Sequence, residues 1–207
     1  MQIYLFLLPK FINMSLFQPF TTIYHESLAF FLHPQVYWRE LKSGSRKNVF
    51  GFRNFLVPGL IIGFVCIVLG DLIFHSKNGF FWQDSLVKAC RKTLFIFMLL
   101  TFSVMITKFV LGQFHFELKM KTARKIAVIS LAPAVLKTVI TGLLPFLDLG
   151  GVLPWYGFFL AYFGFETFFV IPDEKKFYFY FALFMAIFSL IMFLTFILNR
   201  ISAHILL

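Results

Sequence analysis

Residues 126–176 read IAVIS LAPAVLKTVI TGLLPFLDLG GVLPWYGFFL AYFGFETFFV IPDEKK. The stretch holds two apolar runs of about 20 residues, each long enough to cross a 30 Å hydrocarbon core as an α-helix. The polar turn DLGG at 148–151 separates the two runs, and PDEKK at 172–176 closes the second. The stretch therefore predicts a helical hairpin across a membrane, and the neighbouring apolar runs repeat the pattern.

The composition of the whole chain is that of an all-α integral membrane protein. Of its 207 residues, 60% are hydrophobic and 14% are charged, whereas soluble domains carry about 25% charged residues. The apolar runs are continuous and do not alternate in units of about 10 residues, which excludes a transmembrane β-barrel. The net charge of +10 comes from basic clusters between the runs, so it indicates orientation in a bilayer and not nucleic-acid binding.

Five apolar runs are long enough to span, and we expect them to form one helical bundle. This membrane domain covers residues 54–200, after an N-terminal segment at 1–53 and before a short tail at 201–207. The predicted spans are residues 54–74, 93–111, 126–147, 152–171 and 177–198.

The N-terminal segment has an amphipathic part and a basic part. Apolar residues recur at helical spacing from Phe17 to Phe31, which predicts a helix lying in the interface; a disordered tail is the alternative. Residues 39–53 are basic and rich in turn formers, as in a polar juxtamembrane linker, with Trp38 at headgroup depth. No basic region and cleavage site of a signal peptide precede them, and Met1 and Met14 are both candidate starts.

Basic residues orient the five predicted spans. With the N-terminus in the cytoplasm, the inner segments carry twelve basic residues and the outer segments five, so the positive-inside rule places the C-terminus outside or in a lumen. The inner residues are Lys10, Arg39, Lys42, Arg46, Lys47, Arg53, Lys119, Lys121, Arg124, Lys125, Lys175 and Lys176; the outer ones are Lys77, Lys88, Arg91, Lys92 and Arg200.

Two ionisable residues are predicted to form an intramembrane polar pair. Lys137 lies near the middle of the third span and Glu166 near the inner end of the fourth. Their backbones then differ in depth by about 9 Å, most of which a lysine side chain covers. The pair is either a structural ion pair or part of a polar path for an ion, a proton or a lipid headgroup. Lys108 competes for Glu166 at a similar depth.

Small residues and a proline predict where helices pack. Gly157, Ala161 and Gly164 share one face of the fourth span, and Pro133 kinks the third. The chain has two cysteines outside any CxxC spacing, and it has no HExxH, GxSxG or Gly-rich phosphate loop. The sequence therefore offers no catalytic, cofactor-binding or metal-binding residues, and an enzyme is not predicted.

The order of these elements resembles the YIP family of Rab/Ypt-interacting membrane proteins, in particular its bacterial members. The resemblance covers residues 34–200 and is carried by Pro34 to Trp38, Ala127 with Ala132-Pro133, the turn at 147–151, Trp155-Tyr156-Gly157, Tyr162-Phe163-Gly164 and the segment at 172–176. It implies a five-span fold in a bacterial inner membrane. The chain lacks the Asp-Leu-Tyr-Gly-Pro motif and the Gly-Tyr pair of eukaryotic members, so the GTPase binding and vesicle budding of those members are not carried over.

Three functions follow from these features. The first is a non-enzymatic scaffold or adaptor whose partners are the lipid bilayer, a second copy of the chain or other membrane proteins. The second is a small transporter or channel component that uses Lys137 and Glu166. The third, a membrane-embedded enzyme, has no nucleophile or metal set in the sequence to support it.

Overall fold

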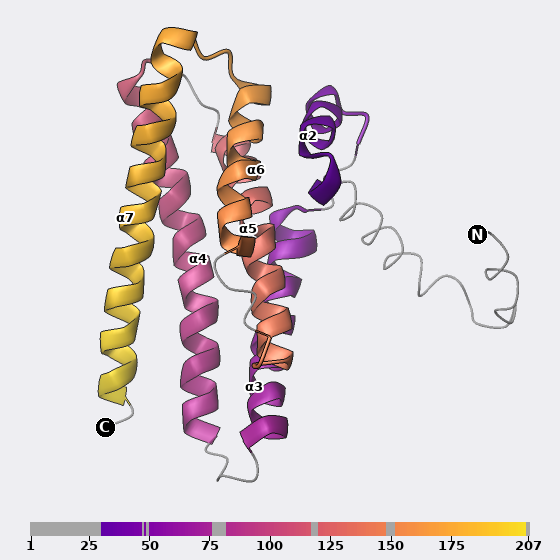
Figure 1. Cartoon of the computed structure of the whole chain (residues 1–207), viewed down its shortest axis with the longest axis vertical. Coiled ribbons are helices and arrows are strands. Elements are labelled where there is room, and N and C mark those ends of the chain that lie inside the picture. Colours follow the sequence, from indigo (N-terminus) through magenta and orange to yellow (C-terminus); the bar gives the residue numbers. More distant parts are fainter. Residues whose placement is uncertain are drawn as a thin grey trace, which may run out of the picture.

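The fold is a bundle of long helices with a short helix docked beside one end (Figure 1). The structure is a computed structural model that describes residues 30–46, 48, 50–75, 82–116, 120–147 and 152–205. The predicted amphipathic helix from Phe17 and the turn at 148–151 fall largely or wholly outside these ranges. The helices are α2 (Pro34–Ser43), the π-helix η1 (Phe52–Leu56), α3 (Val57–His75), α4 (Trp82–Gln113), α5 (Met120–Leu143), α6 (Val152–Phe168) and α7 (Asp173–Ile205).

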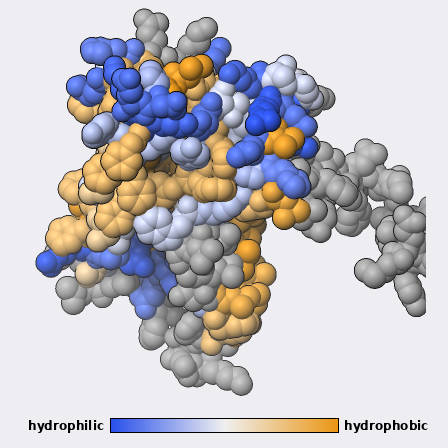
Figure 2. Space-filling view, turned by 45° about the horizontal axis from the view of Figure 1, so that its top comes forward, coloured by the Kyte–Doolittle hydropathy of each residue, from blue (hydrophilic) through white to orange (hydrophobic). Residues whose placement is uncertain are grey.

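Four of the described helices are long and apolar enough to cross a membrane, which confirms the all-α membrane class. They cover Phe52–Phe74, Trp82–Gln113, Met120–Leu143 and Asp173–Ala203. Figure 2 shows an apolar band below a polar end of the molecule. α6, predicted as a span over 152–171, has 17 residues, about 25 Å of helix at 1.5 Å per residue. It is therefore not among these four.

Two helices extend well beyond the predicted spans. α4 begins at Trp82 and not near residue 93, so the basic residues at 88–92 lie on a helix and not in a loop. α7 begins at Asp173, so the acidic and basic residues at 173–176 form its first turns. Hydropathy marks where a helix enters hydrocarbon, not where it starts. No Gly or Pro interrupts residues 82–111, and Asp84, Asp173 and Glu174 in the first turns suit the positive end of a helix dipole.

α3 and α5 run parallel in close contact because glycines replace side chains at their crossing. A Cβ on Gly59 would lie 2.6 Å from Val135, and one on Gly63 would lie 3.3 Å from Thr138. A Cβ on Gly70 would overlap the backbone carbonyl of Gly142. The residue numbers of the contacts increase together along α3 and α5, so the two helices are parallel. They approach most closely at Gly70.

α5 and α6 are antiparallel, again in contact through glycine. Gly157 lies against the carbonyl of Ser130, and Gly164 lies against Ile126. Pro133 is buried inside α5, and Ala161 packs at the edge of the main apolar cluster. By this register α6 begins about level with Lys137, so the last six residues of α5, about 9 Å, extend past it. Figure 1 shows α6 beside only the upper part of α5.

α7 packs along α4 in the opposite direction. Near one end, the rings of Phe114 and Phe179 have centroids 5.6 Å apart. Near the other end, Arg91 Nη1 donates a hydrogen bond to Asn199 Oδ1 at 3.1 Å. The segment from Leu144 through α6 therefore carries the chain back along the bundle, from the end of α5 to the start of α7.

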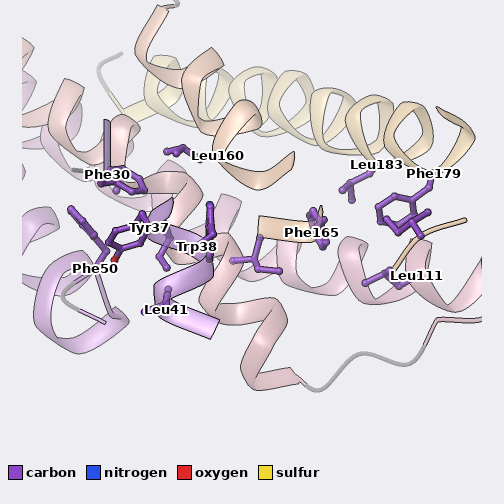
Figure 3. Close-up of a cluster of buried hydrophobic side chains, with 14 of the residues drawn as sticks. Phe30, Tyr37, Trp38, Leu41, Phe50, Leu111, Leu160, Phe165, Phe179 and Leu183 are labelled. Carbon is purple, nitrogen blue, oxygen red and sulfur yellow. The ribbon is translucent and has the colours of Figure 1, made fainter. Parts of the chain in front are cut away.

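The short helix α2 is fixed to the bundle by buried aromatic side chains. Phe30, Tyr37, Trp38 and Phe50 have no exposed surface and gather beside Leu160 of α6 (Figure 3). Trp38 was predicted to lie at headgroup depth, but it is buried against Gly164 and Phe168. The predicted polar linker at 39–53 is partly helical, because α2 continues to Ser43 before Gly44 turns the chain at φ 79°.

Gly70→Ala should destabilise the protein, since its new methyl group meets a backbone carbonyl that cannot move without shifting α5. We expect a loss of about 1–3 kcal/mol, the usual cost of overpacking, measured as a lower melting temperature in detergent. Gly112→Ala is the matched control. Gly112 lies in α4 with nothing within 4 Å of its added Cβ, so this change should be neutral or stabilise by about 0.5–1 kcal/mol. Equal melting temperatures for the two variants would contradict the α3–α5 contact.

Candidate functional site

The predicted pair of Lys137 and Glu166 is replaced by other contacts. Glu166 Oε1 lies 2.8 Å from Lys176 Nζ and accepts a hydrogen bond from the hydroxyl of Tyr180 at 3.1 Å. Both partners come from the first turns of α7, which the sequence interpretation had assigned in part to a loop. Glu166 therefore joins the end of α6 to the start of α7.

The register of α6 explains why Lys137 and Glu166 are far apart. Gly164 lies level with Ile126 of α5, so Glu166 lies level with about residue 124. Lys137 is thirteen residues further along α5, about 20 Å away at 1.5 Å per residue. The depths estimated from the sequence assumed that the third and fourth spans both extend to the turn at 148–151. That assumption is wrong, because α6 begins only about level with Lys137.

Lys137 instead lines a cationic cavity between α4, α5 and α7. The cavity has a volume of about 450 Å³. Three basic side chains line it, Arg91, Lys92 and Lys137, and no carboxylate is among the described residues of its wall. The other polar residues of the wall are Thr138, Thr141, Thr195 and Asn199.

A buried carboxylate stands behind these cations. Asp71 of α3 is only 7% exposed; its Oδ1 lies 2.7 Å from Lys88 Nζ, and its Oδ2 accepts a hydrogen bond from Ser85 at 3.2 Å. The charge of Lys92 interacts with those of Asp71, Lys88, Arg91 and Lys137. Among the described residues, Lys92 thus interacts with three other cations and one acid, and that acid is already paired with Lys88.

A second, apolar cavity lies next to the cationic one. It has a volume of about 290 Å³ and lies between α4, α5, α6 and α7, and its wall shares Phe95 and Ala134 with that of the cationic cavity. Two of the predicted packing residues, Gly157 and Ala161, also line it. The two cavities are therefore adjacent, with the charged one on one side of Phe95 and Ala134 and the apolar one on the other.

A third cavity lies between α2 and α6, at the opposite end of the bundle from Lys137. Its volume is about 650 Å³, and its wall includes Arg39, Lys42, Tyr162 and Glu166. The ammonium of Lys42 donates a hydrogen bond to the carbonyl of Thr167 across it. Its cations face the carboxylate of Glu166, so its charges are balanced better than those of the cationic cavity.

The sequence interpretation missed Arg91 and Lys92 as site residues because it placed them in a loop. One signal was present: Lys88, Arg91 and Lys92 stand at i, i+3 and i+4, the spacing of a single helix face. Their contact with Lys137 depends on the packing of three helices, which spacing along one chain does not reveal.

No family model, curated protein or solved structure matches this chain. The site is therefore interpreted from its own geometry, and the resemblance to the YIP family is carried by the sequence motifs alone.

Asp71→Asn should destabilise the protein, because Lys88 would lose its ion pair among neighbouring cations. Loss of a hydrogen bond between charged groups costs about 1.5–3 kcal/mol, so we expect a lower melting temperature. Adding Lys88→Met to this variant should restore part of the loss. Asp84→Asn removes an exposed acid from the same end of the bundle and should have little effect. An equal loss from Asp84→Asn would show that total charge, and not the Asp71 contacts, matters.

Proposed function

We propose that this protein is a non-enzymatic, multi-pass membrane scaffold or adaptor of the YIP type. The observation that supports the proposal is the rigid attachment of α2, a helix outside the four long spans, to the membrane bundle. A scaffold needs a surface held in a constant position relative to the bilayer, and an attached α2 provides one.

Contacts from two membrane helices hold α2 in place. The hydroxyl of Tyr156 on α6 donates a hydrogen bond to the carbonyl of Phe31 at 2.8 Å. Lys125 of α5 donates one to the carbonyl of Leu41 at 3.3 Å. These bonds flank the buried rings of Tyr37 and Trp38, so both the position and the rotation of α2 are constrained.

The outer face of α2 is polar and basic. Gln35, Arg39, Lys42 and Ser43 are exposed at the open cavity between α2 and α6, and the exposed basic residues Lys121 and Arg124 lie at the adjoining start of α5. Anionic lipids of the cytoplasmic leaflet attract such juxtamembrane basic residues at about 1 kcal/mol each. The proposed partners of this face are therefore an anionic bilayer surface and an acidic segment of another membrane protein.

The proposed topology has five crossings, with α2 in the cytoplasm and the C-terminus outside. Two considerations support it: the excess of basic residues around α2, and the return of the chain along the bundle through residues 144–168. The fifth crossing would be the 17-residue helix α6.

The transport alternative is weaker than it was from the sequence. It relied on Lys137 and Glu166 acting together, and Glu166 is held by Lys176 and Tyr180 at the other end of α6. The cationic cavity has no acid on the described part of its wall. That arrangement suits the binding of an anion, whereas a proton or ion relay requires a chain of ionisable groups.

Trp38→Ala tests the scaffold directly. Removal of a fully buried Trp costs about 3–5 kcal/mol, enough to release α2 from α6, and trypsin should then cleave at Arg39 and Lys42 much faster than in the wild type. A cross-linked partner captured through α2 should be lost at the same time. Val36→Ala, an exposed change on the same helix, should alter neither result. Charge-dependent flux through reconstituted vesicles that Lys137→Met abolishes would contradict the scaffold.

Labelling of single cysteines tests the proposed topology. In a chain with Cys66→Ala and Cys90→Ala, an impermeant maleimide should label Ser43→Cys only from the cytoplasmic side. It should label Ala203→Cys only from the opposite side, because five crossings separate the two positions. Ser43 and Ala203 are both exposed. Labelling of both from one side would mean an even number of crossings.

A further inference from the structure

We propose that the cationic and apolar cavities together bind one anionic phospholipid. Its phosphate lies among Arg91, Lys92 and Lys137, and one of its acyl chains lies in the apolar cavity. The second acyl chain stays in the surrounding bilayer. This goes beyond the scaffold role and does not depend on it.

The charge of the cavity fits a phosphate group. Arg91 and Lys92 have no carboxylate within 4.0 Å among the described residues, and Asp71 is already held by Lys88. Arg91 is positioned by its hydrogen bond to Asn199, with other guanidinium N–H donors left over. The hydroxyls of Thr138 and Thr141 donate to the carbonyls of Ala134 and Lys137 on their own helix, so the neutral donor that the wall adds is the hydroxyl of Thr195. Arginine, lysine and hydroxyl groups together are the usual ligands of a phosphate.

The depth of the cavity fits a lipid headgroup. The long apolar run of α4 begins at Thr93, directly after Arg91 and Lys92, so these cations lie where the hydrocarbon begins. Asn199 and Arg200 end the apolar run of α7 at the same level, as the hydrogen bond between Arg91 and Asn199 shows. A basic pocket at this level lies beside the phosphate groups of the adjacent leaflet, which border the hydrocarbon core.

The apolar cavity fits one acyl chain. Along α4 it extends from Phe95 to Thr107, about 18 Å at 1.5 Å per residue, close to the 15 Å that one leaflet contributes to a 30 Å core. Its wall is mainly Phe, Leu, Ile and Ala side chains. The hydroxyl of Ser103 is bonded to the carbonyl of Leu100 on its own helix, so it does not demand a polar ligand.

The packing of α7 explains where the space for an acyl chain lies. α5 and α7 each pack closely on α4, but they do not pack closely on one another. Large aromatic side chains connect α7 to α6 instead, such as Phe158 of α6 against Phe184 of α7, whose ring centroids lie 5.1 Å apart. The space left between α5 and α7 is where both cavities lie.

The experiment measures the melting temperature of the purified full chain in a neutral detergent as lipid is added. Phosphatidylglycerol should raise the melting temperature in a saturable way, because a ligand that binds only the folded state stabilises it. Phosphatidylcholine with the same acyl chains should not, and neither should glycerol phosphate or inorganic phosphate. These arms separate an anionic lipid from a neutral lipid and from a free phosphate compound.

Two variants test the two halves of the site. Arg91→Gln with Lys92→Gln should raise the phosphatidylglycerol concentration at half-maximal shift about 25-fold, or about 5-fold per cation. Lys108→Gln with Lys175→Gln removes the same charge from two exposed positions at the far ends of α4 and α7 and should change it less than about 2-fold. Ala134→Phe, at the junction of the two cavities, should weaken binding of long-chain phosphatidylglycerol more than that of a six-carbon version, whereas the exposed change Ala203→Phe should not.

Three results would overturn the proposal. An equal rise in melting temperature with phosphatidylcholine would show that the cations do not select the lipid. A full shift with glycerol phosphate alone would replace the lipid by a soluble phosphate compound. An equal loss of affinity in the Lys108 and Lys175 control would show that general surface charge, and not the cavity, binds the lipid.

Discussion

The register of α6 on α5 is the contact on which the rest of the structure depends. Gly157 against the Ser130 carbonyl and Gly164 against Ile126 leave no room for the helices to slide, since any side chain there would separate them. The face of α5 that carries Ile126 and Ser130 continues through Ala134, Lys137 and Thr141 at helical spacing. Past the level at which α6 begins, the same face of α5 lines the cationic cavity. Because α6 begins only about level with Lys137, it leaves this space between α5 and α7 open.

Separation of charge along the bundle follows from this register. Glu166 is carried to the end where α2, Lys42 and Lys176 lie, and it is neutralised there. Lys137 lines the cavity at the other end with Arg91 and Lys92, and the buried acid described nearby, Asp71, is paired with Lys88. Cationic side chains near hydrocarbon are costly. An anionic ligand would offset this cost, so the two cavities and the excess charge have one explanation in common.

The sequence was enough to predict an all-helical membrane protein, because continuous apolar runs can be satisfied only by helices. It was not enough for the ends of α4 and α7, since helices such as Trp82–Gln113 continue past hydrocarbon without a change that hydropathy detects. The sequence also did not predict which residues lie beside Lys137, because small residues on the facing surfaces of two helices decide their register. Trp38 is ambiguous in the same way: its amphipathic ring suits an interface or a buried contact, and only the presence of Gly164 opposite decides between them.

Disulfide cross-linking of α5 to α6 tests the register most directly. In a chain without Cys66 and Cys90, Ile126→Cys with Gly164→Cys should oxidise rapidly to a disulfide. An added Cβ at Gly164 lies 3.1 Å from Cγ2 of Ile126, so the Cβ atoms of the two positions lie within one bond length of that distance, close to the separation that a disulfide requires. Lys137→Cys with Glu166→Cys should stay reduced under the same conditions, since about 20 Å of helix separates the two positions. Rapid cross-linking of the second pair, with none of the first, would contradict the account.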